Sequence, residues 1–125
     1  MLPGNREHTL PIITYDEIKA VVNIKGRSIS SEVQEYFNEF LPYFRDCLSK
    51  DPKDLEVVIQ LEYFNTQTSK ILMDFFGIIK DEVVAKGFNP DVTWYVEKGD
   101  EDLIETVGDY EYLTHIKMKI NEISE

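Results

Sequence analysis

Four segments of the chain alternate between apolar and polar residues, which is the pattern of a β-strand with one buried face. The longest alternating run is DLEVVIQLEY at residues 54–63. Further runs with the same period lie at residues 18–25, 91–98 and 115–123. Residues 10–15 form a shorter candidate, and the proline within it restricts that strand to the edge of a sheet.

The alternation also predicts how these strands face the core and where they end. Ile18 begins the inward-facing positions of the strand at residues 18–25, and Gly26 is expected to end that strand. In the last strand, Ile120 is expected to point inward, whereas His115 is expected to lie on the outer face.

Apolar residues that recur at spacings of three and four predict helices between the strands. One amphipathic helix is predicted at residues 31–49 and a second at residues 66–86, with a glycine directly after its end. Residues 99–113 indicate a short acidic helix or a helical turn. Ser31 followed by Gln34 has the form of a capping box at the start of the first helix.

Strands and helices that alternate along a chain require crossover connections and therefore a largely parallel sheet. Strands covered on both faces usually read as continuous apolar runs, whereas these strands alternate. We therefore expect a two-layer α/β domain with a mixed, mostly parallel sheet of about four to five strands and helices packed mainly on one face. The 125 residues are predicted to form one such domain, with a flexible tail at residues 1–9.

The composition is that of a globular protein from a reducing compartment. Cys47 is the single cysteine, so the chain cannot close an internal disulfide. No apolar run approaches the roughly 20 residues that a membrane span needs, and the N-terminal residues lack the apolar core of a signal peptide. We therefore expect a soluble, cytoplasmic protein.

The net charge of −11 narrows the classes of partner. Nucleic acid and anionic membrane surfaces repel an acidic protein, so neither is expected as a partner. Protein partners with basic or mixed surfaces are favoured, although acidity that serves only solubility explains the same charge.

Sequence signatures of an enzyme or of a cofactor site are absent. Neither a G-x-x-x-x-G-K-[ST] loop nor a G-x-G-x-x-G loop is present to bind a nucleotide. His8 and His115 lie at opposite ends of the chain, and Cys47 falls within an apolar helix, where a buried structural thiol is the common case. We therefore expect no catalytic residue, no cofactor and no metal site.

An acidic run follows the strand at residues 91–98. Its carboxylates lack the order of a calcium-binding loop. We interpret Asp100 instead as the cap of a short helix, whose first turn carries acids that face the positive end of the helix dipole. The run comprises Glu97, Asp100, Glu101, Asp102 and Glu105.

The junction between the strand at residues 54–63 and the next helix carries more small polar side chains than capping requires. Asn65, Thr66, Thr68 and Ser69 lie within five positions, although one such residue is enough to cap a helix. A phosphoryl group on a hydroxyl there would be stabilised by the free N–H groups and partial positive charge of the helix N-terminus. The spacing alone leaves two interpretations of this junction. One is plain capping by Asn65 or Thr66, and the other is a hydroxyl that is modified or binds a ligand.

Three segments together resemble the SiaC family of bacterial regulatory phosphoproteins. They are KGRSIS (25–30), LEYFNTQTSK (61–70) and VTWYVEKGDEDLIETVGDYE (92–111), and the similarity extends over about residues 10–123. The resemblance implies a fold like that of the anti-sigma-factor antagonists (the STAS fold) and a partner-switch protein that is not an enzyme. It further implies a cognate Ser/Thr kinase, a PP2C-type phosphatase and, as for the family's namesake, a diguanylate cyclase partner in the control of biofilm formation.

The family's phosphorylation pattern, Tyr-(Leu/Phe)-Asn-Thr-Ser-Ser, falls on residues 63–68 of this chain. The resemblance therefore implies that Thr66 is the phosphorylated residue. The chain departs from the pattern at Gln67, where the family commonly has serine, and this leaves Thr68 and Ser69 as alternative acceptors.

Polar and basic neighbours of Thr66 are candidates for contact with a phosphate or a partner. Asn65 and Gln67 flank it in the chain, and Lys70 follows one helical turn later. Arg27, predicted to lie in a loop, is a second candidate cation. A phosphate on Thr66 would add a charge of about −1.5 to −2 and block docking of a partner by charge and bulk.

A second function class is a constitutive interaction or homodimerisation module without phosphorylation. Val21, Val58 and Tyr95 interrupt the otherwise polar face of the predicted sheet, and apolar side chains there would support self-association.

Overall fold

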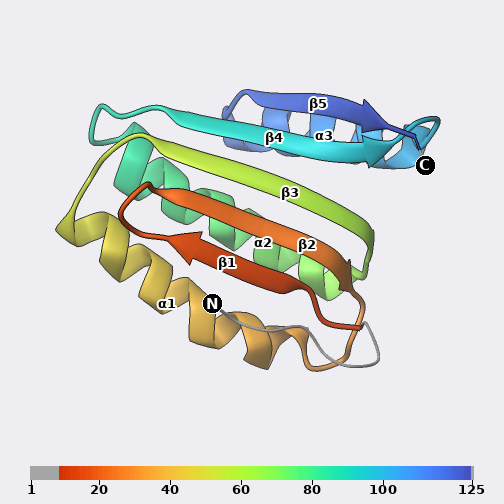
Figure 1. Cartoon of the computed structure of the whole chain (residues 1–125), viewed down its shortest axis with the longest axis horizontal. Helices are drawn as coiled ribbons and strands as arrows, with labels where there is room; N and C mark the ends of the chain where they lie inside the picture. Colours follow the sequence, from red (N-terminus) through yellow and green to blue (C-terminus); the bar gives the residue numbers. More distant parts are fainter. Residues whose placement is uncertain (1–8, 125) are drawn as a thin grey trace.

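The computed structural model describes residues 9–124 and contains a five-stranded sheet (Figure 1). The strands lie side by side in chain order. The first runs antiparallel to its neighbour, and each of the others is parallel to the strand before it. The strands are β1 (Ile12–Asp16), β2 (Val21–Ser28), β3 (Leu55–Phe64), β4 (Pro90–Glu97) and β5 (Met118–Ile123).

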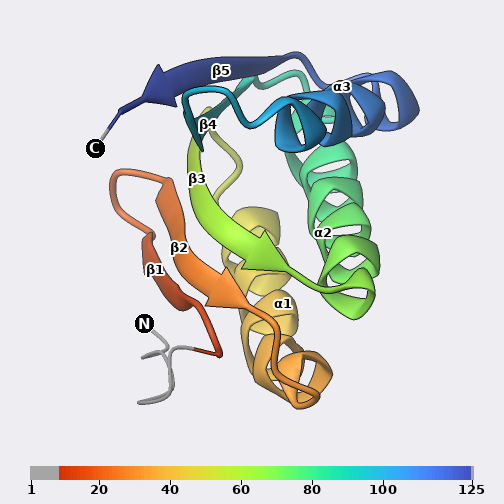
Figure 2. The same cartoon turned by 90° about the vertical axis from the view of Figure 1, so that its right-hand side faces the viewer.

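Helices connect the parallel strands, and all of them cover the same face of the sheet (Figure 2). They are α1 (Val33–Lys50), α2 (Thr66–Ile79) and α3 (Glu101–Thr114), and α2 continues into a π-helical turn, η1 (Lys80–Val84). Within residues 9–124, no element covers the opposite face. This arrangement confirms the predicted two-layer α/β fold with helices on one side of a mostly parallel sheet.

Apolar side chains from the sheet and the helices meet in one core, as the alternation predicts. Val57 of β3 and Trp94 of β4 are buried on the helix-covered face. On the helix side, the rings of Phe44 and Phe75 stack 5.1 Å apart, and Trp94 stacks on Tyr110 of α3 at 5.9 Å. Burial of a large apolar side chain contributes about 1.5–3 kcal/mol, so these contacts hold α1 against α2 and α3 against the sheet.

The strand predicted at residues 18–25 begins and ends later than expected. The Asp16 carboxylate accepts hydrogen bonds from the backbone N–H groups of Ile18 and Lys19, both at 3.0 Å, and these bonds hold a turn before β2. Ile18 lies in that turn and is 83% exposed, so its predicted inward position is wrong. Gly26 does not end the strand, because β2 shifts register after it and continues to Ser28.

The structure contradicts two predictions at the ends of elements, the capping box of the first helix and the start of the last strand. Ser31 and Gln34 do not form a capping box: no side chain caps α1, and the Gln34 amide donates to Asn38 at 2.9 Å. His115 does not lie on a strand, because it adopts a left-handed conformation (φ 59°) that ends α3. The last strand therefore begins only at Met118.

The position of β5 at the edge of the sheet explains one further difference from the prediction. Ile120 is 38% exposed rather than buried, because β5 is an edge strand.

The second predicted helix ends with η1 at Val84, slightly earlier than predicted. The predicted N-terminal tail lies outside the described residues except for Thr9, whose carbonyl accepts bonds from the backbone N–H groups of Ile29 and Ser30. No helix between residues 9 and 124 has the length and apolar character to cross a membrane.

Candidate functional site

Asn65 caps α2 and ties its start to the preceding strands. Its side-chain oxygen accepts a hydrogen bond from the backbone N–H of Thr68 at 2.8 Å, which confirms the predicted N-cap. Its side-chain amide donates to the carbonyl of Ser30 at 3.2 Å, and its backbone N–H donates to the carbonyl of Ser28 at 3.0 Å. The first turn of α2 is therefore fixed against the end of β2.

The three hydroxyl side chains of this junction lie in different environments. Thr66 is the first residue of α2 and is exposed to solvent. Thr68 is 0% exposed, and its hydroxyl donates to the carbonyl of Ser28 and lies 2.8 Å from the Ser28 hydroxyl. Ser69 is half-buried, and its hydroxyl lies 2.8 Å from that of Tyr110. In this conformation, Thr66 is the hydroxyl that another protein reaches most directly.

The first turn of α2 is suited to an anionic group. The N–H of Thr68 is taken by Asn65, whereas those of Thr66 and Gln67 belong to the groups that the start of an α-helix leaves unpaired. Gln67 is exposed, and this turn carries no acidic residue. The partial positive charge of the helix N-terminus is therefore not offset by an acid of that turn.

Both candidate cations are exposed to solvent. Lys70 is exposed four residues after Thr66, which puts the two on one face of α2. Arg27 lies on β2 rather than in a loop, so its predicted location is wrong. Its Nε lies 3.4 Å from the Glu62 carboxylate, and its guanidinium lies 5.4 Å from the centre of the Tyr63 ring. Exposed contacts of this kind are worth about 0–1 kcal/mol, so a new anion nearby can recruit Arg27.

The acidic run has the structural role that its sequence predicts. The Asp100 carboxylate accepts a hydrogen bond from the backbone N–H of Leu103 at 3.1 Å, which confirms it as the cap of α3. Glu101 and Asp102 occupy the first turn of that helix. Between residues 9 and 124, no group of three His, Cys, Asp or Glu side chains is placed to hold a metal ion. His8 lies outside the described residues.

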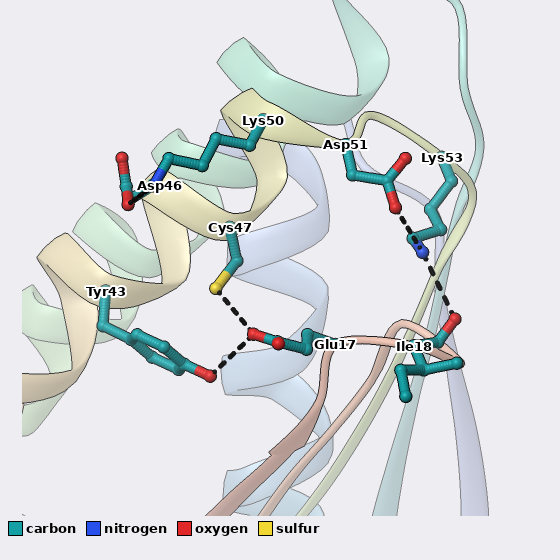
Figure 3. A pocket seen from close by; sticks show the side chains of 8 residues that line it. All are labelled: Glu17, Ile18, Tyr43, Asp46, Cys47, Lys50, Asp51 and Lys53. Atoms are coloured by element: carbon teal, nitrogen blue, oxygen red, sulfur yellow. Dashed lines mark hydrogen bonds and ion pairs between the residues drawn. The ribbon is translucent and has the colours of Figure 1, made fainter.

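A pocket of about 480 Å³ lies between the β1–β2 turn and the last turns of α1 (Figure 3). The Glu17 carboxylate accepts hydrogen bonds there from the hydroxyl of Tyr43 at 3.0 Å and from the thiol of Cys47 at 3.3 Å. We call this region the Glu17 pocket. Burial and the bond to Glu17 raise the pKa of the Cys47 thiol, so the sulfur keeps its proton at neutral pH. Cys47 is half-buried, not fully buried as its place in an apolar helix predicted.

Sequence reasoning missed three of these residues because their partners are distant in the chain. Ser28 and Tyr110 bond to Thr68 and Ser69, from which they are separated by 40 and 41 positions. Glu17 lies between the two segments predicted as strands at residues 10–15 and 18–25, where no pattern marks it. For Tyr110, the spacing of apolar residues on the acidic helix indicates an inward position. That spacing predicts burial of the ring, but it does not predict which residue bonds to the hydroxyl.

A comparison with protein families gives a match over nearly the whole chain. The model of the family described as SiaC family regulatory phosphoprotein matches residues 5–123. The chain belongs to the SiaC family. The three segments that resemble this family thus lie within one continuous match, and the chain belongs to a family of regulatory phosphoproteins.

Solved structures from Pseudomonas aeruginosa share the fold with this SiaC-family chain. One comes from a crystal structure of the diguanylate cyclase SiaD in complex with its activator SiaC, with a TM-score of 0.87, 20% identity and 97% of each chain covered. A structure of SiaC has a TM-score of 0.81 at 18% identity, covering 98% of this chain and 95% of the other. A crystal structure of apo-SiaC has a TM-score of 0.80 at 18% identity, covering 95% and 94%. No curated protein sequence matches the chain.

Proposed function

We propose that this chain is a non-enzymatic partner-switch protein and that reversible phosphorylation of Thr66 controls its binding to a signalling partner. One observation carries the choice of residue: Thr66 is exposed at the first position of α2, whereas Thr68 is buried against Ser28 and Ser69 is engaged by Tyr110. A kinase needs its acceptor hydroxyl free in solvent. Modification of Thr68 would therefore require that the first turn of α2 open.

The local charges favour a phosphate at this position. The unpaired N–H groups at the start of α2 and its partial positive charge stabilise an anion there. Lys70 lies on the same helix face as Thr66, and Arg27, close to the end of β2, is the second candidate cation. Both are already exposed, so pairing with a phosphate costs them little desolvation. The phosphate would remain on the surface, where a PP2C-type phosphatase can remove it.

The regulated partner is a protein, and a diguanylate cyclase is the first candidate. The support is that a similar structure contains SiaC as the activator of the diguanylate cyclase SiaD. Thr66, Gln67 and Lys70 form the exposed start of α2 that we expect to touch the partner. A phosphate adds about −1.5 to −2 to a chain of net charge −11, and its charge and bulk would displace a partner docked at this turn.

Phosphopeptide mapping by mass spectrometry, on the protein isolated from its own cells, tests the site. We expect phosphate on Thr66 under at least one growth condition. Binding of Thr66→Ala and Thr66→Glu proteins to a diguanylate cyclase from the same cells then tests the switch. Thr66→Ala should bind irrespective of kinase treatment and Thr66→Glu should not bind, whereas the neighbouring Gln67→Ala control should remain switchable.

Three outcomes would change this assignment. Phosphate at Ser69 or Thr68 would keep the switch and move its site. A Thr66→Ala protein that still loses its partner after kinase treatment would refute the role of Thr66. An unmodified junction under all conditions, with a mass that rises with concentration, would favour the constitutive module in which Val21, Val58 and Tyr95 on the uncovered sheet face support a homodimer.

A further inference from the structure

The Glu17 carboxylate accepts hydrogen bonds from two neutral donors in its pocket, and within residues 9–124 it forms no ion pair. The Tyr43 hydroxyl and the Cys47 thiol both donate to the same oxygen, Oε2 (Figure 3). Neutral donors stabilise a carboxylate less than a guanidinium or an ammonium group does. Glu17 therefore lacks a paired cation, and both of these bonds leave its other oxygen, Oε1, available to a further donor.

The two lysines that line the pocket are engaged elsewhere. Lys50 Nζ pairs with Asp46 at 2.9 Å, and Lys53 Nζ pairs with Asp51 at 2.8 Å. Lys53 also donates to the backbone carbonyl of Ile18 at 3.2 Å. These two ion pairs cancel, so the pocket carries a net charge of −1, and that charge belongs to Glu17.

Apolar surface adjoins this unpaired charge. Ile18 lines the pocket from the β1–β2 turn and is 83% exposed, and Tyr43 on α1 is 46% exposed. The side chain that complements such a surface has an apolar stem and a cationic head. An arginine fits best, because its planar guanidinium pairs with a carboxylate in two-pronged geometry and stacks on an aromatic ring.

We propose that the Glu17 pocket binds an arginine side chain of a partner protein, with the guanidinium on Glu17 and Tyr43 and the aliphatic stem along Ile18. Charge complementarity supports this occupant. The chain has a net charge of −11, and the carboxylate that lines this pocket of about 480 Å³ forms no ion pair within residues 9–124. That volume accommodates one long side chain and its flanking residues.

This site is separate from the proposed switch. Glu17 lies in the turn before the first residue of β2. Thr66 begins α2, and the residue before it, Asn65, is bonded to Ser28 at the other end of β2. The eight residues of this strand span roughly 25 Å. An arginine in the Glu17 pocket and a phosphate on Thr66 therefore do not touch. The inference does not rest on the proposed function, and binding here is expected to be the same in Thr66→Glu protein.

A titration of the full chain, followed by ¹⁵N NMR, tests the proposal. The probe is the peptide acetyl-Leu-Arg-Leu-amide, and its matched control replaces arginine by citrulline, which has the same shape without the charge. We expect saturable shifts of the Ile18, Tyr43 and Cys47 amide signals with a Kd on the order of 1 mM for the arginine peptide. The citrulline peptide should bind at least tenfold more weakly.

Two variants locate the binding. Glu17→Gln keeps an oxygen that accepts from Tyr43 or Cys47 but removes the charge, and it should weaken arginine-peptide binding at least tenfold. Glu105→Gln removes the same charge from an exposed position on α3 and should change the Kd less than twofold. Unperturbed signals from the rest of the sheet verify that both variants are folded.

Several results would overturn the proposal. These are equal affinity for the arginine and citrulline peptides, no saturation in wild-type protein, or full binding by Glu17→Gln protein. Equal affinity for a lysine peptide would contradict the assignment to arginine. Loss of binding in the Thr66→Glu protein would show that the pocket belongs to the switch surface. That result would contradict the separation of the two sites, and it would not test whether Thr66 is phosphorylated.

Discussion

The hydroxyl of Ser69 in the first turns of α2 lies 2.8 Å from the hydroxyl of Tyr110 on α3. The same Tyr110 oxygen lies 3.1 Å from the carbonyl oxygen of Ser69, to which it donates. Tyr110 also stacks on Trp94, the single tryptophan, at 5.9 Å. The start of α2, where we place the switch, is thereby joined to α3 and to a ring whose fluorescence reports on its surroundings.

Replacement of Tyr110 by phenylalanine should weaken this connection while the ring stays in the core. The variant loses the bonds to Ser69 but keeps the stacking on Trp94, so we expect the free energy of unfolding to fall by about 1–2 kcal/mol. Urea unfolding followed by Trp94 fluorescence measures the change. Tyr112→Phe removes the same hydroxyl from a residue that is 79% exposed, and it should stay within about 0.5 kcal/mol of wild type.

The N-cap of α2 should make a measurable contribution to stability. Asn65→Ala removes the acceptor for the Thr68 N–H and the donor to Ser30, and we expect a loss of about 1–2 kcal/mol in urea unfolding. Asn65→Asp keeps an oxygen for the Thr68 N–H and loses only the donor, so its loss should be smaller. If both variants lose the same amount, the bond to Ser30, not the cap, holds this junction.

The buried pair of Ser28 and Thr68 predicts non-additive substitutions. Thr68→Val leaves the Ser28 hydroxyl without its partner in a fully buried position, and we expect a cost of about 1–3 kcal/mol. Ser28→Ala leaves Thr68 its bond to the Ser28 carbonyl at 2.8 Å and should cost less. In a double-mutant cycle, the two changes together should cost less than their sum, with a coupling of about 0.5 kcal/mol or more. Strict additivity would mean that the two hydroxyls do not interact.

The sequence predicts those parts of this molecule that depend on neighbours in the chain. Alternating apolar positions locate the parallel strands and the one-sided sheet. Short polar residues before a helix identify the cap Asp100 and limit the cap of α2 to Asn65 or Thr66, of which Asn65 is the one observed. The error at Ile18 has a local cause as well: the residues that alternate there belong to a turn held by Asp16, and a period of two over so few residues does not distinguish a turn from a strand.

The environment of the candidate site depends instead on contacts between distant segments. That Thr68 is buried and Thr66 exposed follows from the packing of α2 against β2, and no repeat in residues 65–69 encodes it. The bonds that decide this, to Ser28 and Tyr110, cross 40 and 41 positions. The same holds for the Glu17 pocket, which forms where a turn meets a helix that lies later in the chain.

Glu82 predicts how stability depends on pH. It is buried on η1 and pairs with Lys86 Nζ at 2.6 Å and with Arg45 Nη1 at 3.0 Å. The hydrogen bond from Lys86, together with the charge of Arg45, holds the pKa of Glu82 below its ordinary value of 4.5. As the pH falls below about 4.5, the unfolded chain takes up this proton before the folded chain does, so the folded state loses stability.

Urea unfolding of wild-type and Glu82→Gln protein, at several values between about pH 3 and pH 7, measures this contribution. In wild type, stability should be fully present above the ordinary carboxyl pKa and should decline as the pH approaches the lowered pKa of the folded state. The decline should be shallower in Glu82→Gln, whereas Glu105→Gln, which lacks an exposed carboxylate instead, should follow wild type. Parallel curves for wild type and Glu82→Gln would mean that the ion pairs of Glu82 with Lys86 and Arg45 do not stabilise the fold.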